Sequence, residues 1–355
     1  MSAVEQVDIR RARVNSLAGL KVVALAMIFV WHFGFFTTPD LGSRMCEFFF
    51  ACSGVLEAIR HFGKYEYTLG ESFDNFVKKF KKMYPVYLVT FVLALLLGQL
   101  GASAWNAAKY KIVAILSLFM LQVWDARTMF AFNGASWFLC DLLICYAFTP
   151  FMSYVVERVK RKAKDSNRAV WLLLVSCVLL RLTIDFAVGH GALTISTHTF
   201  PPVRLLDYFI AYVCGCLALD WNEREGASVA MGGKALQTAV ELAVLLLYVI
   251  QVLLTTKLVV SRTFGMICAV LVVLVFVFCR GGASSFFSSA PFLHLARIEL
   301  EFYMVHQLCI WFCYFAFPSH GRLFIVASAL ALTFVMSFVV KYAERAVRKL
   351  FDRVF

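Results

Sequence analysis

The sequence predicts an all-α, polytopic membrane protein with about ten transmembrane helices. Hydrophobic residues make up 61% of its 355 residues and charged residues only 16%, whereas soluble domains are about 45–50% apolar and about 25% charged. The mean hydropathy is +0.78, so most of the surface must face lipid. This composition excludes a cytosolic enzyme, a nucleic-acid-binding domain and a disordered scaffold. The net charge of +12 is interpreted as a sign of membrane topology.

Eleven apolar runs divide the chain, and one of them is too short to span a membrane. The run 112–124 has thirteen residues, fewer than the ~17 that a helix needs to cross the hydrocarbon core. We therefore expect 112–124 to be re-entrant or interfacial and the other runs to be spans. The predicted spans fall near 18–37, 46–60, 84–100, 136–156, 170–188, 204–220, 236–255, 263–279, 297–317 and 322–341.

The distribution of basic residues predicts the orientation of these spans in the membrane. If 112–124 does not cross, the basic clusters at 158–168 and 341–353 lie on the same side as the basic N-terminus, and 24 of the 34 Lys and Arg residues are inside. Because basic loops stay in the cytoplasm, both termini are predicted to be cytoplasmic. We expect one integral-membrane domain over 1–355 of a cell membrane protein, without an appended soluble domain. The cysteines lie mostly inside apolar runs, so neither a disulfide framework nor a metal site is expected.

Ionisable residues inside a bilayer are costly and are candidates for function. His32 lies in the outer half of the first span. Lys21 lies eleven residues earlier, about 16 Å away along a helix, at the predicted cytoplasmic end. The alternative for His32 is a packed histidine bonded to a neighbouring carbonyl group.

Small residues mark the second span. Ser53 and Gly54 follow two phenylalanines and let another helix, or a thin ligand, approach the backbone closely. Glu57, on the same face as Ser53, is expected either to orient Lys21 or Lys82 or to serve helix packing.

Four lysines between 78 and 82 precede the third span. Such a cluster at the inner membrane face is either an anchor for lipid phosphates or a binding site for a phosphorylated cofactor.

Taken together, these segments resemble the membrane acyltransferase 3 family, the integral-membrane O-acyltransferases of cell-surface glycans. The matching motifs are Lys21-x10-His32, Phe49-Phe50-x-x-Ser53-Gly54 and Lys79-x-x-Lys82-Met83-Tyr84-Pro85. Later similar segments are Ser136–Leu139, Arg204–Asp207, Tyr303–His306 and Ala343–Arg345. The chain departs from the family in having lysine where relatives mostly carry arginine, and Asp141 where many have a glutamate after the tryptophan.

The resemblance implies transfer of an acyl group, usually acetyl, from cytoplasmic acyl-coenzyme A (acetyl-CoA) to a hydroxyl of an outward-facing glycan or a lipid-linked acceptor. Lys21, Lys79 and Lys82 would bind the phosphates of the donor, and its pantetheine arm would pass Ser53 and Gly54. His32 would act as the base or as a transient acyl carrier.

Other polar residues have supporting roles in this prediction. Arg181 and Asp185, four residues apart, are expected to pair within one helix. Trp137 and Asp141 are candidates either to hold the catalytic residue in position or to line the acceptor site. Glu299 and His306 are further candidates, because seven residues bring them nearly onto one helical face, whereas Glu301 points about 200° away from Glu299.

Two other classes of function also fit a protein with ten spans. One is a secondary transporter or flippase for an envelope glycan or lipid intermediate, and the other is a non-catalytic partner of an envelope assembly machine. The series of inner lysines, small residues and a deep histidine favours the enzyme, because a transporter has no evident need to bind coenzyme A phosphates. We find no internal repeat of the kind typical of inverted-repeat transporters.

Overall fold

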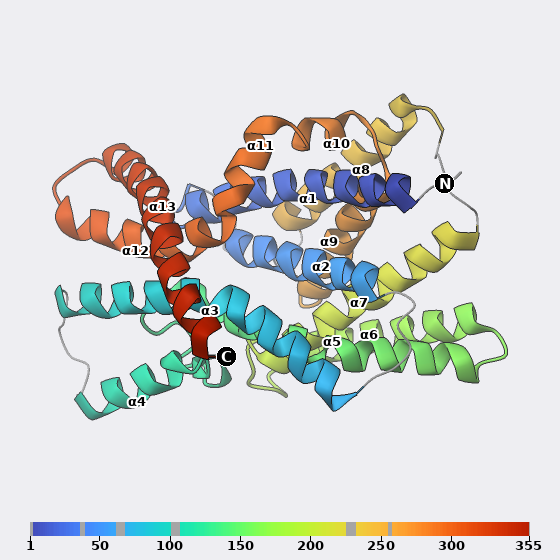
Figure 1. Cartoon of the computed structure of the whole chain (residues 1–355), viewed down its shortest axis with the longest axis horizontal. Helices are drawn as coiled ribbons and strands as arrows, with labels where there is room; N and C mark the ends of the chain where they lie inside the picture. Colours follow the sequence, from blue (N-terminus) through green and yellow to red (C-terminus); the bar gives the residue numbers. More distant parts are fainter. Residues whose placement is uncertain are drawn as a thin grey trace. The chain divides into compact units, whose positions relative to one another are not determined.

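The structure, a computed structural model, describes residues 3–35, 40–61, 68–100, 107–224, 232–254 and 258–354. Within these ranges the regular elements are all helices (Figure 1). The long helices are α1 (Ala3–Trp31), α2 (Leu41–His61), α3 (Leu69–Leu100), α5 (Trp137–Lys162), α6 (Ser166–Gly189), α7 (Pro201–Arg224), α8 (Lys234–Leu254), α9 (Ser261–Phe278), α12 (Glu299–Ala316) and α13 (Arg322–Val354). The short ones are α4 (Ala107–Leu118), α10 (Gly282–Phe287) and α11 (Ala290–Leu295).

Seven helical segments in the described residues are long and apolar enough to cross a membrane. They belong to α3, α5, α6, α7, α8, α9 and α13. The apolar part of α1 is the shorter stretch Asn15–Trp31, while α2 and α12 carry charged residues such as Glu47 and Glu301. The protein is therefore all-helical and multi-pass. Ten spans and cytoplasmic termini remain a prediction.

The segment around 112–124 is not a continuous spanning helix, in agreement with the sequence. The helix α4 ends at Leu118, and two 3₁₀ turns (Gln122–Trp124 and Gly134–Ser136) separate it from α5. Met120 and Phe132 each have a φ of 59°, a left-handed conformation that residues other than glycine rarely adopt. Irregular backbone of this kind is tolerated at membrane depth only where protein or water satisfies its polar groups.

The chain divides into two compact units. Unit 1 comprises Met1–Ser72, Phe148–His198 and Pro202–Arg297, and unit 2 comprises Phe73–Ala147, Thr199–Pro201 and Ile298–Phe355.

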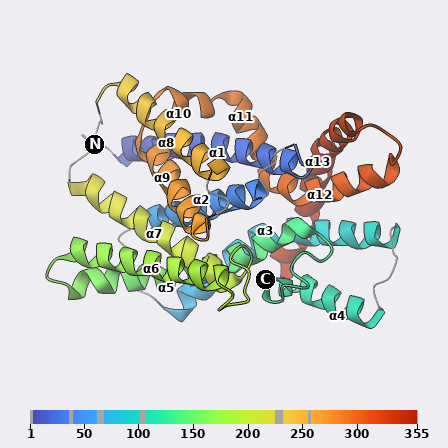
Figure 2. The same ribbon diagram turned by 180° about the vertical axis from the view of Figure 1, so that it is seen from behind.

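In unit 1, α2 packs against α1 and α9, and α8 packs on α9 (Figures 1 and 2). The Ser16 hydroxyl donates to the Phe276 carbonyl oxygen at 2.9 Å and joins α1 to α9. The short helices α10 and α11 lie along α1. Their position is fixed by Glu241 of α8, whose fully buried carboxylate accepts from the backbone N–H groups of Gly281, Ala283 and Ser284 at the start of α10. A carboxylate is favourable there because the N-terminal N–H groups of a helix have no intrahelical acceptor.

In unit 2, α12 packs along α13 (Figure 1). The Phe302 and Phe334 rings lie 5.3 Å apart, and the Lys341 ammonium group lies 3.3 Å from a Glu301 carboxylate oxygen. On α3, Phe80 stacks on Tyr84 with ring centroids 4.4 Å apart.

The lysine run, which precedes the predicted third span at 84–100, lies inside the same helix as that span. The helix α3 begins at Leu69 and continues through Pro85. Thr68 and Glu71 form a capping box at its start, since each side chain bonds the other's backbone N–H group at 3.1 Å. This pattern is a sequence signature of a helix N-terminus. Because the helix begins there, the lysines at 78–82 lie within it.

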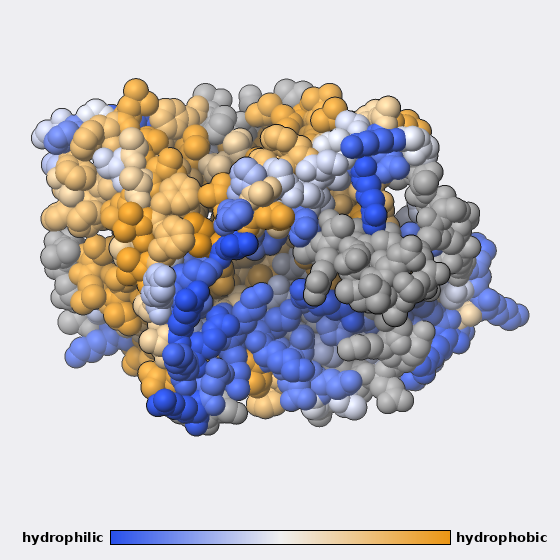
Figure 3. Space-filling model, turned by 45° about the horizontal axis from the view of Figure 1, so that its top comes forward, coloured by the Kyte–Doolittle hydropathy of each residue, from blue (hydrophilic) through white to orange (hydrophobic). Residues whose placement is uncertain are grey.

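Much of the surface is apolar, as a lipid-facing protein requires (Figure 3). Large hydrophobic side chains on α6, α8 and α13 are exposed, among them Leu172, Leu246 and Val335.

Candidate functional site

His32 follows directly after Trp31, the last residue of α1. Its backbone N–H donates to the Ile28 carbonyl oxygen at 3.3 Å, and its half-buried ring lies 4.9 Å from the Trp31 ring. Lys21 is also half-buried on α1. The eleven-residue spacing brings the two residues to within about 20° of one helical face, about 16 Å apart along the axis. The helix α1 is continuous from Lys21 to Trp31, and His32 follows directly after it.

The end of α1 that carries His32 lies beside the start of α2. A Cβ atom added to Gly42 would lie 2.6 Å from the Trp31 ring, so only glycine allows this contact. Gly42 is two residues from Arg44, which is fully buried. His32 therefore belongs to the end of unit 1 where charged side chains are buried.

These buried charges, with the half-buried Asp40 and Arg262, form one connected set, which we call the ion network. It joins the starts of α2, α7 and α9 with the end of α6. Its members are Asp40, Arg44, Glu47, Arg181, Asp185, Arg204, Asp207 and Arg262.

Asp207 is the centre of one half of the ion network. It accepts from Arg181 Nε at 2.8 Å and from Arg204 Nη1 at 2.9 Å. Arg181 also pairs with Asp185, and the other Asp185 oxygen accepts from the Thr263 N–H and hydroxyl at 3.1 and 2.8 Å. The predicted pair Arg181–Asp185 is confirmed, and it is part of a larger set that connects α6, α7 and α9.

Glu47 is the centre of the other half. Arg44 donates to it at 3.1 Å, while Arg262 and Arg204 lie 3.4 and 3.7 Å away. Arg44 also donates to the Ser261 hydroxyl at 2.6 Å. Because each buried carboxylate has more than one cationic or hydrogen-bonding partner, the cost of removing these charges from water is offset within the cluster.

The motif with two phenylalanines and Ser53-Gly54 packs against α7. The Arg204 guanidinium lies 5.6 Å from the centre of the Phe50 ring. A Cβ atom on Gly54 would lie 2.6 Å from the Tyr208 carbonyl oxygen, and one on Gly215 would lie 2.8 Å from the Ala58 Cβ atom. The small residues therefore bring two helix backbones together, which is one of the two roles that the sequence left open.

Ser53 and Glu57 differ in their surroundings. Ser53 is half-buried and lies 100° around α2 from Gly54, away from the contact with α7. Glu57 is buried, pairs with Arg60, and lies 3.4 Å from the His61 ring nitrogen. Both of these partners lie on α2 itself.

The predicted phosphate ligands of α3 belong to unit 2. Lys79 Nζ lies 4.1 Å above the Tyr146 ring, and Lys82 is exposed. The Lys82 carbonyl oxygen accepts from Arg348 of α13 at 3.4 Å. Phe351 of α13 packs 5.5 Å from Tyr84, so a basic surface extends over both helices.

Trp137, Asp141, Glu299 and His306 also belong to unit 2, where two of the similar segments meet. The Asn133 side chain donates to the Met304 carbonyl oxygen at 2.8 Å, and the Phe138 and Tyr303 rings lie 5.4 Å apart. Trp137, Asp141 and His306 are buried, and Glu299 is half-buried at the start of α12. Glu301 instead pairs with Lys341.

Neutral hydrogen bonds hold the irregular segment of unit 2. Gln122 Nε2 lies within donating distance of the Tyr87 hydroxyl (3.2 Å), the Ser136 hydroxyl (3.1 Å) and the Cys140 sulfur (3.3 Å). Tyr84 donates to the Leu118 carbonyl oxygen at 2.9 Å. These bonds fix the stretch before Trp137.

Sequence reasoning missed several buried polar residues. Arg44 and Glu47 lie at the edge of an apolar run, and Glu241 lies within one. Glu47 and Glu241 are charges in predicted spans, which alone marks a candidate for function or pairing, and Arg44 lies just before one. Gln122 lay in the run that was too short to span.

The comparison with protein families connects this geometry to an activity. A family model described as an acyltransferase domain (acyltransferase 3) matches residues 14–342. The chain belongs to the acyltransferase 3 family. The match extends from α1 through α13, and it supports acyl transfer as the activity of this multi-pass membrane protein. Comparisons with curated proteins and with solved structures found no match.

Proposed function

We propose that this acyltransferase moves an acyl group, most simply acetyl, from cytoplasmic acyl-CoA to a hydroxyl of a cell-surface glycan or a lipid-linked glycan. The observation that carries the proposal is the half-buried His32 directly after the end of α1, in line with Lys21 of that helix. The family match over residues 14–342 supports the reaction class.

His32 is the proposed catalytic residue. As a base, its imidazole takes the proton of the acceptor hydroxyl while the hydroxyl oxygen attacks the thioester carbonyl carbon. The new C–O bond forms as the C–S bond breaks, and the imidazolium returns the proton to the sulfur of coenzyme A. As a transient carrier, the imidazole nitrogen attacks the thioester carbonyl carbon, the C–S bond breaks, and the CoA thiolate leaves with the imidazole N–H proton. The acceptor hydroxyl oxygen then attacks the acyl carbon, the N–C bond breaks, and the hydroxyl proton returns to the imidazole.

Lysines are the proposed ligands of the donor phosphates. Lys21 lies on the His32 helix, whereas Lys79 and Lys82 lie on α3 within the basic surface of unit 2. An ammonium group binds phosphate as a point charge without the two-pronged geometry of arginine. Loss of one lysine is therefore expected to raise the KM for acyl-CoA more than it lowers kcat.

The ion network supports His32 in this proposal. Bonds between Glu47, Asp207 and their arginines hold the starts of α2 and α7 together. The contact between Trp31 and Gly42 joins α1 to that end of α2. A fixed backbone around His32 keeps the base oriented toward the reacting atoms.

Purified protein in lipid vesicles, supplied with acetyl-CoA labelled in the acetyl group, tests the proposal. Release or transfer of the label should fall about 10²–10⁴-fold in His32→Ala, the usual contribution of a general base. The matched control is His294→Ala, which removes an exposed imidazole from α11 and should leave turnover unchanged. Full activity in folded His32→Ala protein would overturn the assignment.

Acid quenching during turnover separates the two roles of His32. A carrier leaves labelled acetyl on the protein in the absence of an acceptor, and His32→Ala removes that label. A base leaves the protein unlabelled at every time point.

A further inference from the structure

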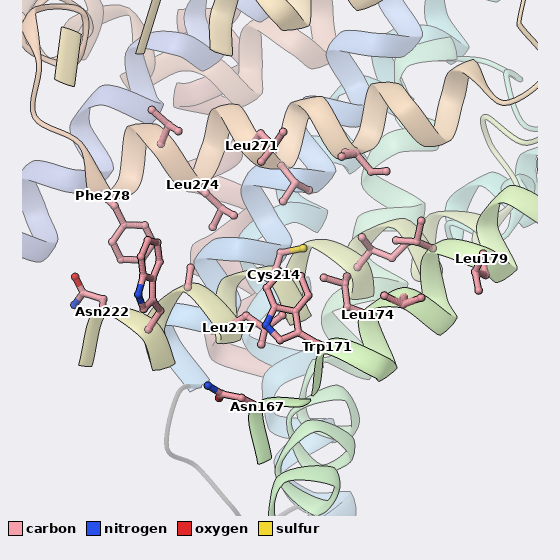
Figure 4. Close-up of a pocket in the computed structure, with 18 residues that line it drawn as sticks. Asn167, Trp171, Leu174, Leu179, Cys214, Leu217, Asn222, Leu271, Leu274 and Phe278 are labelled. Carbon is pink, nitrogen blue, oxygen red and sulfur yellow. The ribbon is translucent and has the colours of Figure 1, made fainter. Parts of the chain in front are cut away.

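A groove on the lipid-facing side of unit 1 is not used by the proposed reaction. It lies between α6, α7 and α9 and has a volume of about 840 Å³. Figure 4 shows Leu174 of α6 and Leu271 and Leu274 of α9 facing it from opposite sides, with Cys214 and Leu217 of α7 between them. The walls are almost entirely apolar, and lining residues such as Trp171 and Leu179 are more than half exposed. The groove therefore opens sideways toward the bilayer.

The polar residues of the groove gather at one end. Asn167 lies at the start of α6, and Trp221 and Asn222 lie near the end of α7. From Asn167 to Leu179, α6 rises about 18 Å, close to the ~15 Å of one leaflet of the hydrocarbon core. Tryptophan and amide side chains are suited to the boundary between head groups and acyl chains. The groove thus has the length and polarity of a single lipid chain with its head group at the Asn167 end.

Positive charge surrounds that end. The segment 161–168, which contains Asn167, carries four exposed basic side chains and one carboxylate, Asp165. The basic residues are Arg161, Lys162, Lys164 and Arg168. Clusters of this kind attract anionic lipid head groups.

We propose that the groove binds one acyl chain of an anionic phospholipid from the leaflet that faces segment 161–168. The Asn167 and Asn222 amides bond the head group, and the basic side chains of the segment select its negative charge. A helix of a second copy is about 10 Å wide with its side chains, too wide to enter a chain-sized groove, so a lipid is the better occupant.

Quenching of tryptophan fluorescence by brominated lipids tests this proposal on the full-length protein in detergent micelles. The probes are phosphatidylglycerol and phosphatidylcholine brominated along one chain, and the signal is the part of the fluorescence that is lost in Trp171→Phe/Trp221→Phe. We expect brominated phosphatidylglycerol to quench this signal at a several-fold lower mole fraction than brominated phosphatidylcholine.

Two variants, each with a control, test separately the binding of the acyl chain and the selection of the head group. Ala218→Phe fills the groove from α7 and should abolish the quenching, whereas Ala243→Phe on the exposed face of α8 should not. Lys164→Gln/Arg168→Gln should remove the preference for phosphatidylglycerol, and Arg158→Gln on α5 should preserve it. These lysine and arginine side chains are exposed, so their variants should fold even if Ala218→Phe does not.

Three results would overturn the proposal. Equal quenching by both lipids would mean ordinary annular lipid. Protection from both lipids in a particle of twice the expected mass would mean that a second copy covers the groove. Displacement of the quencher by palmitoyl-CoA, without any head-group preference, would assign the groove to a long-chain donor.

Discussion

Unit 1 and unit 2 accommodate polar side chains in apolar surroundings by different means. In unit 1 the polar groups are ions, with Asp207 between Arg181 and Arg204 and Glu47 beside Arg44. In unit 2 the bonds that hold the irregular segment join neutral groups, with Gln122 near the Tyr87 and Ser136 hydroxyls. The ions join regular helices, whereas the neutral groups hold a stretch with little regular structure.

The two kinds of network serve different structural purposes: one fixes the ends of helices, and the other satisfies irregular backbone. An isolated charge in a low-dielectric interior is very costly, so an ion network is stable only when its charges balance. Such an ion network fixes helix ends, and the loss of any one of its charges is strongly destabilising. A neutral network loses only hydrogen bonds when it is altered, and it satisfies an irregular backbone that could not otherwise be buried. One of the fixed helix ends, the start of α2, lies against Trp31, the neighbour of His32.

The largest expected effect is that of Arg181→Met. It leaves Asp185 and Asp207 without one cationic partner, and breaking a buried ion pair in this way costs about 3–5 kcal/mol. Thermal unfolding in detergent should show a large loss of Tm. The double variant Arg181→Met/Asp185→Asn, which restores the charge balance, should recover part of it. If the single variant is as stable as the double, the network is not held by its charges.

Gln122→Leu in unit 2 should have a smaller effect. It removes the amide that bonds Tyr87, Ser136 and Cys140, and a lost buried hydrogen bond costs about 1–3 kcal/mol. The same thermal measurement should place it between Arg181→Met and the wild type. A loss equal to that of Arg181→Met would contradict the distinction between the two units.

Acid should weaken unit 1 through His198, in the loop before α7. Loss of contact with water lowers the pKa of His198 well below its usual range, and the charges of Arg204, Arg262 and Arg44 lower it further. The unfolded chain therefore binds the proton more readily than the folded protein does. The contribution of neutral His198 to the free energy of unfolding is complete above about pH 6.5, the pKa in the unfolded chain, and is lost as the pH falls below that value. His198→Gln should reduce this loss of Tm between neutral and acidic pH. An unchanged pH profile would show that His198 is not the titrating group.

The smallest effect is expected outside both networks. Arg127 bonds Asp125 through exposed side chains, and this pairing lowers the pKa of Asp125. Exposed pairs contribute little in water and are screened by salt. Asp125→Asn should therefore leave Tm unchanged at moderate salt. A clear loss would mean that this loop has a structural role.

Much of the helical architecture was predictable, because its signals are local. Apolar runs of span length located the long helices, and the short run near 112–124 marked the segment that does not cross. The pair Arg181–Asp185 followed from a spacing of four residues on one helix. The capping box at Thr68 and Glu71 was equally local, yet its polar surroundings concealed the early start of α3.

The partners of buried groups were not predictable, since they are distant in the sequence. Nothing near Arg181 indicates Asp207, and nothing near Glu241 indicates the N–H groups of Gly281 and Ser284. The small residue Gly54 was compatible with a ligand or a helix, and only the position of α7 shows the helix contact. The roles of Lys21, His32 and the α3 lysines stay predictions until the variants are measured.

The ion network has a consequence for how the chain is made. The helix α2 carries Arg44 and Glu47, but their partners Arg204 and Ser261 follow far downstream. At a synthesis rate of about 5–20 residues per second, Arg204 leaves the ribosome on the order of 10 s after Glu47. Throughout that interval α2 carries charges that each cost about 2.5–3.5 kcal/mol to insert. Until then Arg44 and Glu47 have only each other as charged partners, and the bonds that join the start of α2 to α7 and α9 can form only once those helices have been made.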